Sequence, residues 1–204
     1  MQIRSGFLLA VAGAAVLAGC GGGTGGGAAA KATPAAHVVR SVGHRPDSDH
    51  NGVPDPITVK GALGDALALE GSGLEDDPAN PSSHAKSRIR VTLLRVRGPF
   101  KGFDVPTGRT IVGVDLRFLN VGRFVYKNPQ PQGDLTVAGG ETGKQTSLIT
   151  VGTKSPCDDP SLTLQPGRSM NACIAFEVPK GKRPRTFEYT ADAGYGDRGL
   201  WRLR

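Results

Sequence analysis

The chain has 204 residues, with 25 lysines and arginines against 18 aspartates and glutamates, and a formal net charge of +7 at pH 7. Only 5% of the residues are aromatic, and they are not interleaved with a basic stripe. Binding to single-stranded nucleic acid normally combines a basic groove with aromatic platforms. The composition therefore predicts no nucleic-acid partner.

The first 20 residues predict a signal peptide of the lipoprotein type. Arg4 gives a short basic region, residues 7–17 are apolar, and Leu17-Ala18-Gly19-Cys20 has the form of a lipobox. The apolar run is too short for a transmembrane helix of about 20 residues, and an ordinary secretory signal requires no cysteine at its cleavage site. We expect loss of residues 1–19, lipidation of Cys20 with acyl chains such as palmitate, and a lipid anchor on the extracytoplasmic face of the cell membrane.

Residues 20–46 are predicted to be a flexible tether. The part from Cys20 to Ala36 is almost wholly Gly, Ala and Thr and has no large apolar side chain. Such a segment cannot bury enough surface to offset the entropy lost on ordering. A folded domain is therefore expected only further along the chain.

An acidic segment at residues 47–58 has the spacing of a short cation-binding loop. Oxygen ligands fall at positions 1, 3, 5, 7 and 9, and a glycine falls at position 6. The ligands would be the side chains of Asp47, Asp49, Asn51 and Asp55 and the carbonyl of Val53. The segment resembles the calcium loops of dockerin and thrombospondin type 3 repeats, although Thr58 replaces their acidic ligand at position 12. It predicts a weak calcium site, and an acidic linker turn is the alternative interpretation.

From Arg88 onward, apolar residues alternate with polar ones, which is typical of half-buried strands. The alternation slips by one residue at Leu93-Leu94, which predicts a β-bulge. Gly and Pro interrupt the pattern every 8 to 15 residues. We therefore predict an all-β, Ig-like antiparallel β-sandwich over residues 59–204. A long polar loop is expected at residues 71–87, and strands at 89–96, 112–118, 135–137, 148–150, 170–178, 187–191 and 200–203.

Two cysteines remain after lipidation, Cys157 and Cys173. Disulfides persist in exported proteins, and this pair would close a loop of about 15 residues, worth roughly 3 kcal/mol in the chain-entropy model. Cys173 falls on the strand face opposite Ile174. The disulfide should therefore pin the Cys157 loop to the outer face or edge of a sheet.

Motifs that would indicate an enzyme lack their partners. Ser83-His84-Ala85-Lys86 matches the Ser-x-x-Lys pattern of penicillin-binding enzymes, but the Ser-Asp-Asn and Lys-Thr-Gly motifs that accompany it there do not occur. We expect no enzymatic activity. The densest basic cluster, Lys180, Lys182, Arg183 and Arg185, is expected to be a solvated hairpin turn, with weak attraction to anionic lipid or cell-wall polymer as the functional alternative.

Residues 62–204 resemble a family of bacterial extracellular domains of unknown function, related in fold to telokin and to secreted immunoprotective antigens. The likeness lies in Leu63-Gly64-Asp65-Ala66, in the strand that ends at Asn120-Val121-Gly122, and in the strand after Pro166-Gly167 that ends in Phe176-Glu177-Val178-Pro179. The family is common on lipoproteins. The resemblance implies a β-sandwich and no catalytic residues.

Together these observations predict a binding or structural role in the cell envelope, with the membrane as a partner through the lipid anchor. An envelope protein or a cell-wall component is the further partner expected. The alternative function is a binding module for a small ligand, a metal or a cell-wall polymer, with the calcium loop at its entry.

Overall fold

Three long strands at the centre of the fold pair antiparallel with one another: β4 (Arg88–Phe100), β5 (Arg109–Asn120) and β10 (Ser169–Pro179). In the computed structural model, residues 38–39, 48, 55–71, 87–148, 155–157, 161–192 and 195–204 are described. They belong to one unit, Ala35–Arg204, and their regular structure consists of strands. The all-β sandwich predicted from the sequence is confirmed.

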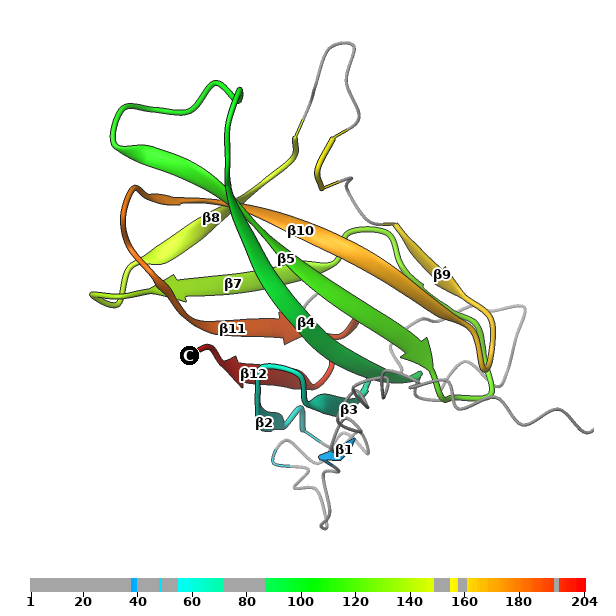
Figure 1. Ribbon diagram of the computed structural model, residues 1–204. Helices are drawn as coiled ribbons and strands as arrows, with labels where there is room; N and C mark the ends of the chain where they lie inside the picture. The colour runs from blue at the N-terminus through cyan, green and yellow to red at the C-terminus, as the bar shows by residue number, and fades with distance from the viewer. Residues whose placement is uncertain are drawn as a thin grey trace, which may run out of the picture. The chain divides into compact units, whose positions relative to one another are not determined.

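The other strands flank this centre in one continuous sheet, ordered β1-β3-β4-β5-β10-β8-β7-β11-β12-β2 (Figure 1). Besides the three central strands, its members are β1 (Val38–Val39), β2 (Thr58–Ala62), β3 (Ala66–Glu70), β7 (Gln132–Val137), β8 (Thr142–Thr146), β11 (Pro184–Thr190) and β12 (Arg198–Arg202). A separate pair is formed by β6 (Tyr126–Asn128) and β9 (Leu162–Leu164).

The sheet turns a corner at β8, which pairs with β10 through Lys144–Thr146 and with β7 through Thr142–Gly143. Aromatic side chains then meet across the two layers. The ring of Phe118 on β5 lies 5.2 Å from that of Tyr189 on β11, and the ring of Phe176 on β10 lies 6.0 Å from that of Phe187. Edge-to-face contacts of this kind stabilise cores beyond simple burial. The main core therefore sits between β4, β5 and β10 on one side and β7, β11 and β12 on the other.

Several local predictions are confirmed. The pairing of β4 with β5 shifts register between Leu93 and Arg95, as the slipped alternation indicated. Val112, Val114, Leu116 and Phe118 all point into the core. Gly181, with φ of +79°, makes the turn between β10 and β11, with the Lys182 N–H donating to the Pro179 carbonyl.

Other local predictions are wrong. Leu148 lies in no strand and packs beside the disulfide, while the rest of the strand expected at 148–150 lies outside the described residues. β8, at Thr142–Thr146, was not predicted. β1, β2, β3, β6 and β9 were not predicted, and β1 lies inside the range assigned to the tether. Two strand pairs are parallel, β1 with β3 and β2 with β12, where antiparallel pairing was expected. Most of the predicted loop 71–87 lies outside the described residues.

The N-terminal strands are held in place by a buried carboxylate. Asp197 is 1% exposed and accepts hydrogen bonds from the N–H groups of Ile57, at 3.2 Å, and Glu70, at 2.9 Å. Trp201 adds a further link, because its indole N–H donates to the Asp65 carbonyl at 3.0 Å. These side-chain contacts fix β2 and β3 against β12, at the edge of the sheet that the described strands form.

Candidate functional site

The disulfide predicted from the sequence is present between Cys157 and Cys173, whose Cα atoms are 5.0 Å apart. Cys173 lies on β10 opposite Asp115 of β5, and Cys157 belongs to the connection that precedes β9. Gly113 on β5 lies directly beneath the bond. A Cβ atom at Gly113 would stand 2.5 Å from the Cys157 sulfur and 2.8 Å from the Cys173 sulfur. Glycine in this strand therefore makes room for the disulfide.

The disulfide lies on the face of β4, β5 and β10 that points away from the main core, as expected. The disulfide is nevertheless shielded from solvent at Cys157, which is only 2% exposed. A second, smaller apolar cluster surrounds it. That cluster contains Ile111, Ala175, Phe100, Phe103, Val105 and Leu148. The Cys157 connection and the segment after β4 thus cover this part of the outer face.

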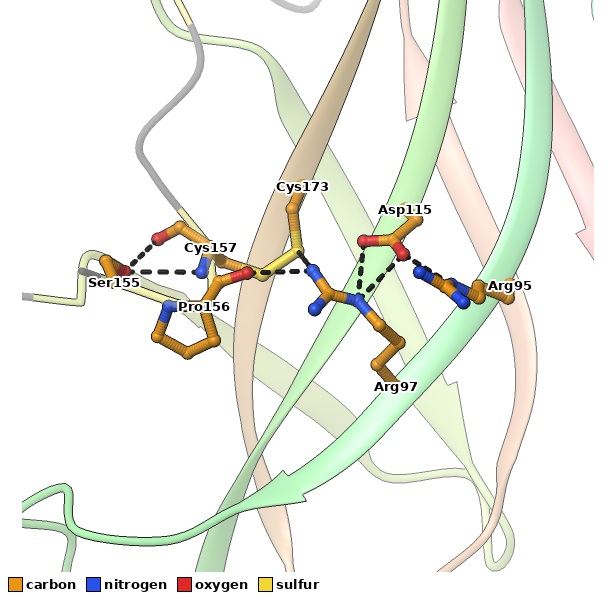
Figure 2. The surroundings of a disulfide bond; sticks show 7 residues. All are labelled: Arg95, Arg97, Asp115, Ser155, Pro156, Cys157 and Cys173. Carbon is orange, nitrogen blue, oxygen red and sulfur yellow. Dashed lines mark hydrogen bonds and ion pairs between the residues drawn. A yellow bond between two sulfur atoms is a disulfide. The ribbon is translucent and has the colours of Figure 1, made fainter.

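Arg97 joins the sheet to the Cys157 connection (Figure 2). Its Nε lies 2.7 Å from a carboxylate oxygen of Asp115, and its Nη2 donates to the Pro156 carbonyl at 2.8 Å. The same Nη2 lies 3.3 Å from the Cys173 sulfur, and the guanidinium sits 5.4 Å above the Phe100 ring. One cation therefore contacts a carboxylate, a carbonyl, a sulfur and an aromatic face.

Arg95 completes this group from the solvent side. Its Nε lies 2.8 Å from Asp115, but its side chain is 68% exposed, against 31% for Arg97. Sequence reasoning missed this group. The predicted bulge could have revealed it. After the shift at Leu93, Arg95 and Arg97 lie on the outer face of the sheet, as Cys173 does.

An open polar cleft of about 650 Å³ lies between the connection from β6 to β7, strand β8 and the end of β11. Its described lining is made of amides, hydroxyls and prolines with one carboxylate, Asp134. The Gln145 side chain accepts from the Gly133 N–H at 3.1 Å and donates to the Pro131 carbonyl at 3.0 Å. The cleft can offer neutral hydrogen bonds to a polar ligand.

Three polar side chains form a buried network in the main core. The hydroxyls of Tyr126 and Tyr189 are 2.9 Å apart, and the Asn128 amide donates to the Tyr189 oxygen at 3.0 Å. Burial raises the pKa of Tyr126, and it raises the pKa of Tyr189 well above its ordinary value of 10.0. Both phenols are therefore neutral hydrogen-bonding groups around neutral pH. Sequence reasoning missed the network because β6 was not predicted.

The remaining predicted site residues lie mostly outside the described part of the chain. Cys20 lies there, and so do the calcium ligands Asp47, Asp49, Asn51 and Val53. Asp55 is described, and its carboxylate accepts from the Ser48 N–H at 3.2 Å, which ties the two ends of the acidic segment together. Among the described residues there is no group of three His, Cys, Asp or Glu side chains placed to hold a metal ion. The calcium site stays a prediction.

The described residues also contain no helix long and apolar enough to cross a membrane. No protein-family model matches the chain, and no curated protein matches it. Membership of the family suggested by the strand and turn motifs therefore stays a prediction.

Solved structures show distant likeness. The secreted protein MPT63 of Mycobacterium tuberculosis is 13% identical, with a TM-score of 0.46 over 72% of this chain and 97% of that one. A β-sandwich protein from Clostridium difficile is 9% identical, with a TM-score of 0.38 over 57% and 85%. The yjhA protein from Bacillus subtilis is 14% identical, with a TM-score of 0.41 over 57% and 91%. The fold assignment rests on the strand pairing of the chain itself.

Proposed function

We propose that this chain is a membrane-anchored lipoprotein of the extracytoplasmic face, whose β-sandwich has a non-catalytic binding or structural role in the envelope. The observation that carries the proposal is the lipobox Leu17-Ala18-Gly19-Cys20 behind a short apolar run. The Cys157–Cys173 disulfide supports an oxidising compartment, since disulfides persist outside the cytoplasm.

The described polar groups support a role without catalysis, because those best suited to chemistry hold the fold together. The two buried tyrosines bond to each other and to Asn128. Arg97 and Asp115 tie the Cys157 connection to β4 and β5, and Asp197 bonds the backbone of β2 and β3. These groups act by positioning strands.

Fractionation of bacterial cells that express the full chain tests the proposal. The wild-type chain should sediment with membranes and stay there in high salt, because acyl chains hold it. The Cys20→Ser variant should be released or remain unprocessed, because it offers no sulfur for the lipid. Protease added to cells with a permeable outer layer should degrade the anchored chain. A wild-type chain found with cytoplasmic proteins would contradict the proposal.

The polar cleft favours a second candidate function, the binding of a neutral, hydroxyl-rich ligand such as a cell-wall glycan. Its amides and hydroxyls are suited to hydrogen bonds with sugar hydroxyls, and polar groups that converge in a cleft are a feature of binding sites. Nuclear magnetic resonance titration with soluble cell-wall fragments tests this function. Shifts confined to Gln132, Thr146 and Thr190 would support it, and shifts absent from these residues would exclude it.

A further inference from the structure

The fold gathers basic side chains from separate connections at one end of the sandwich. The turn between β10 and β11 carries Lys180, Lys182 and Arg183, and all three are exposed. The Lys180 N–H donates to the Gly108 carbonyl at 2.8 Å, and the Arg183 carbonyl accepts from the Ala138 N–H at 2.8 Å. The turn therefore touches both the connection between β4 and β5 and the connection between β7 and β8.

Two further arginines join this end from the start of β11 and the end of β12. Thr186 pairs with Arg202, and the Arg185 carbonyl accepts from the Leu203 N–H at 2.7 Å. Figure 1 shows the β10–β11 turn and the end of β12 on the same side of the strands, at the left of the view. We call these residues the basic end; it comprises Lys180, Lys182, Arg183, Arg185 and Arg202.

The charges of the basic end have no acidic partner in the described part of the chain. Among the described residues, no carboxylate lies within ion-pair distance of these five side chains. Only Gly181 and Pro184 lie between the four basic residues of the turn. The neighbouring cation Arg109 differs, because it pairs with Glu141 and Glu177. Within the described part of the chain, the basic end is thus a positive surface without ion-pair partners.

β3, the strand with which β1 pairs, is connected to one residue of the basic end, Arg202. β1 is the first described strand, and its Val38 pairs with Ala66 at the start of β3. The turn just before Ala66 is bonded to β12, since the Leu63 N–H donates to the Arg202 carbonyl at 3.1 Å. Arg202 is therefore bonded to the turn that leads into β3, the strand with which β1 pairs.

We propose that the basic end docks on the anionic surface of the bilayer that holds the lipid anchor. The inference rests on the proposed lipoprotein function, which places an anionic bilayer beside the domain. The basic end is the part of the domain whose charge complements that bilayer. Each Lys or Arg near an anionic bilayer strengthens binding about five-fold, and an acyl chain combined with a basic patch holds a protein more firmly than the chain alone. Docking would orient the domain with the basic end against the membrane and the opposite end, near Asn120, turned away from it.

A matched pair of double variants tests the docking surface. Lys182→Gln with Arg183→Gln removes two charges from the basic end. Arg123→Gln with Arg168→Gln removes two exposed charges from the opposite end, where Asn120 binds the Arg168 carbonyl through its N–H. The two sites are separated by the length of β5, about 36 Å at 3.3 Å per residue. That distance exceeds the Debye length of about 10 Å in 0.1 M salt.

The measurement is co-sedimentation of the chain from residue 20 with vesicles, in a Cys20→Ser background so that no lipid contributes. Vesicles of phosphatidylcholine with phosphatidylglycerol should bind the Cys20→Ser chain, and vesicles of phosphatidylcholine alone should not. The Lys182/Arg183 variant should bind about 25-fold more weakly. The Arg123/Arg168 variant should stay within about two-fold, because its charges are screened from the bilayer.

Three results would overturn the proposal: no binding to anionic vesicles, an equal loss in both double variants, or equal binding to soluble glycerol phosphate at the same phosphate concentration. Thermal unfolding of each variant checks that the fold is intact. Because the lipid is absent from this assay, its outcome is independent of the anchor. A chain that binds vesicles but is never lipidated in cells would refute the lipoprotein function and leave the basic surface standing.

Discussion

Gly113 and Cys157 are in contact across the outer face of β5, and a Cβ atom at Gly113 would lie 2.5 Å from the Cys157 sulfur. The disulfide is therefore possible only because this strand position lacks a side chain. The relationship links two features that look unrelated in the sequence, a glycine inside a strand and a cysteine in a distant connection.

Gly113→Ala should destabilise the domain by about 1–3 kcal/mol, because the added methyl group must displace the disulfide or the strand. Urea unfolding monitored by tryptophan fluorescence measures the change. The same substitution in a Cys157→Ala, Cys173→Ala background should cost much less, since no sulfur remains to clash. Equal costs in the two backgrounds would show that the glycine serves another purpose.

Arg97→Gln should cost about 1–3 kcal/mol of unfolding free energy, because it breaks charged hydrogen bonds to Asp115 and to the Pro156 carbonyl in a half-buried setting. Arg95→Gln is the matched control. It removes the same charge from the same carboxylate, but at an exposed position, and should cost less than about 1 kcal/mol. Equal effects would mean that the contact with the Cys157 connection contributes nothing.

The buried tyrosine pair should make the domain sensitive to alkali. Burial raises the pKa of Tyr189 well above 10.0, so the unfolded chain ionises at a pH where the folded chain keeps its proton. The stability from the neutral phenol is fully present below pH of about 10 and is lost as pH rises toward the folded pKa. The free energy of unfolding should therefore fall above pH of about 10.

Tyr195→Phe simplifies the measurement, because it leaves only the two buried tyrosines to report by phenolate absorbance. In that background, absorbance should rise together with unfolding. Adding Tyr189→Phe should make the alkaline loss of stability shallower, since one buried phenol is removed. A smooth tyrosine titration in a domain that remains folded would contradict the burial of the pair.

The acidic segment, residues 47–58, should bind calcium weakly, because its oxygen ligands have the spacing of a short calcium loop. Its side chains and the Val53 carbonyl supply fewer oxygens than the six to eight that calcium prefers, so water must complete the shell. Calorimetric titration should give binding in the millimolar range that Asp49→Ala abolishes. Absence of heat, or the same heat from Asp49→Ala, would favour the linker turn.

Much of the fold could be predicted from residue alternation alone. β5 and β10 could be predicted because apolar residues on the buried face alternate with polar residues on the other face. The bulge in β4 could be predicted because the alternation of apolar and polar residues shifts by one position there. β2 and β6 were missed, since strands of three to five residues hold too few apolar positions to show a period. β3 was missed because the first four residues of Ala66–Glu70 are all apolar, so the strand shows no alternation of apolar and polar residues.

The site was less predictable than the fold. The disulfide followed from counting cysteines in an exported chain. The contact of Arg97 with Cys173 and the buried bond between Tyr126 and Tyr189 did not follow, because each joins residues more than 60 positions apart. Only the strand order brings such residues together. The same holds for Arg202, which the pairing of β11 with β12 adds to the basic end.

Mass spectrometry of the N-terminal peptide from the membrane-bound protein tests the central claim most directly. The mature chain should begin at Cys20, without residues 1–19, and should carry a lipid thioether and acyl chains on that residue. Cells fed a labelled fatty acid should incorporate it into the wild-type chain and not into Cys20→Ser. An unmodified Cys20, or a chain that retains Met1, would contradict the account of this protein as an anchored lipoprotein.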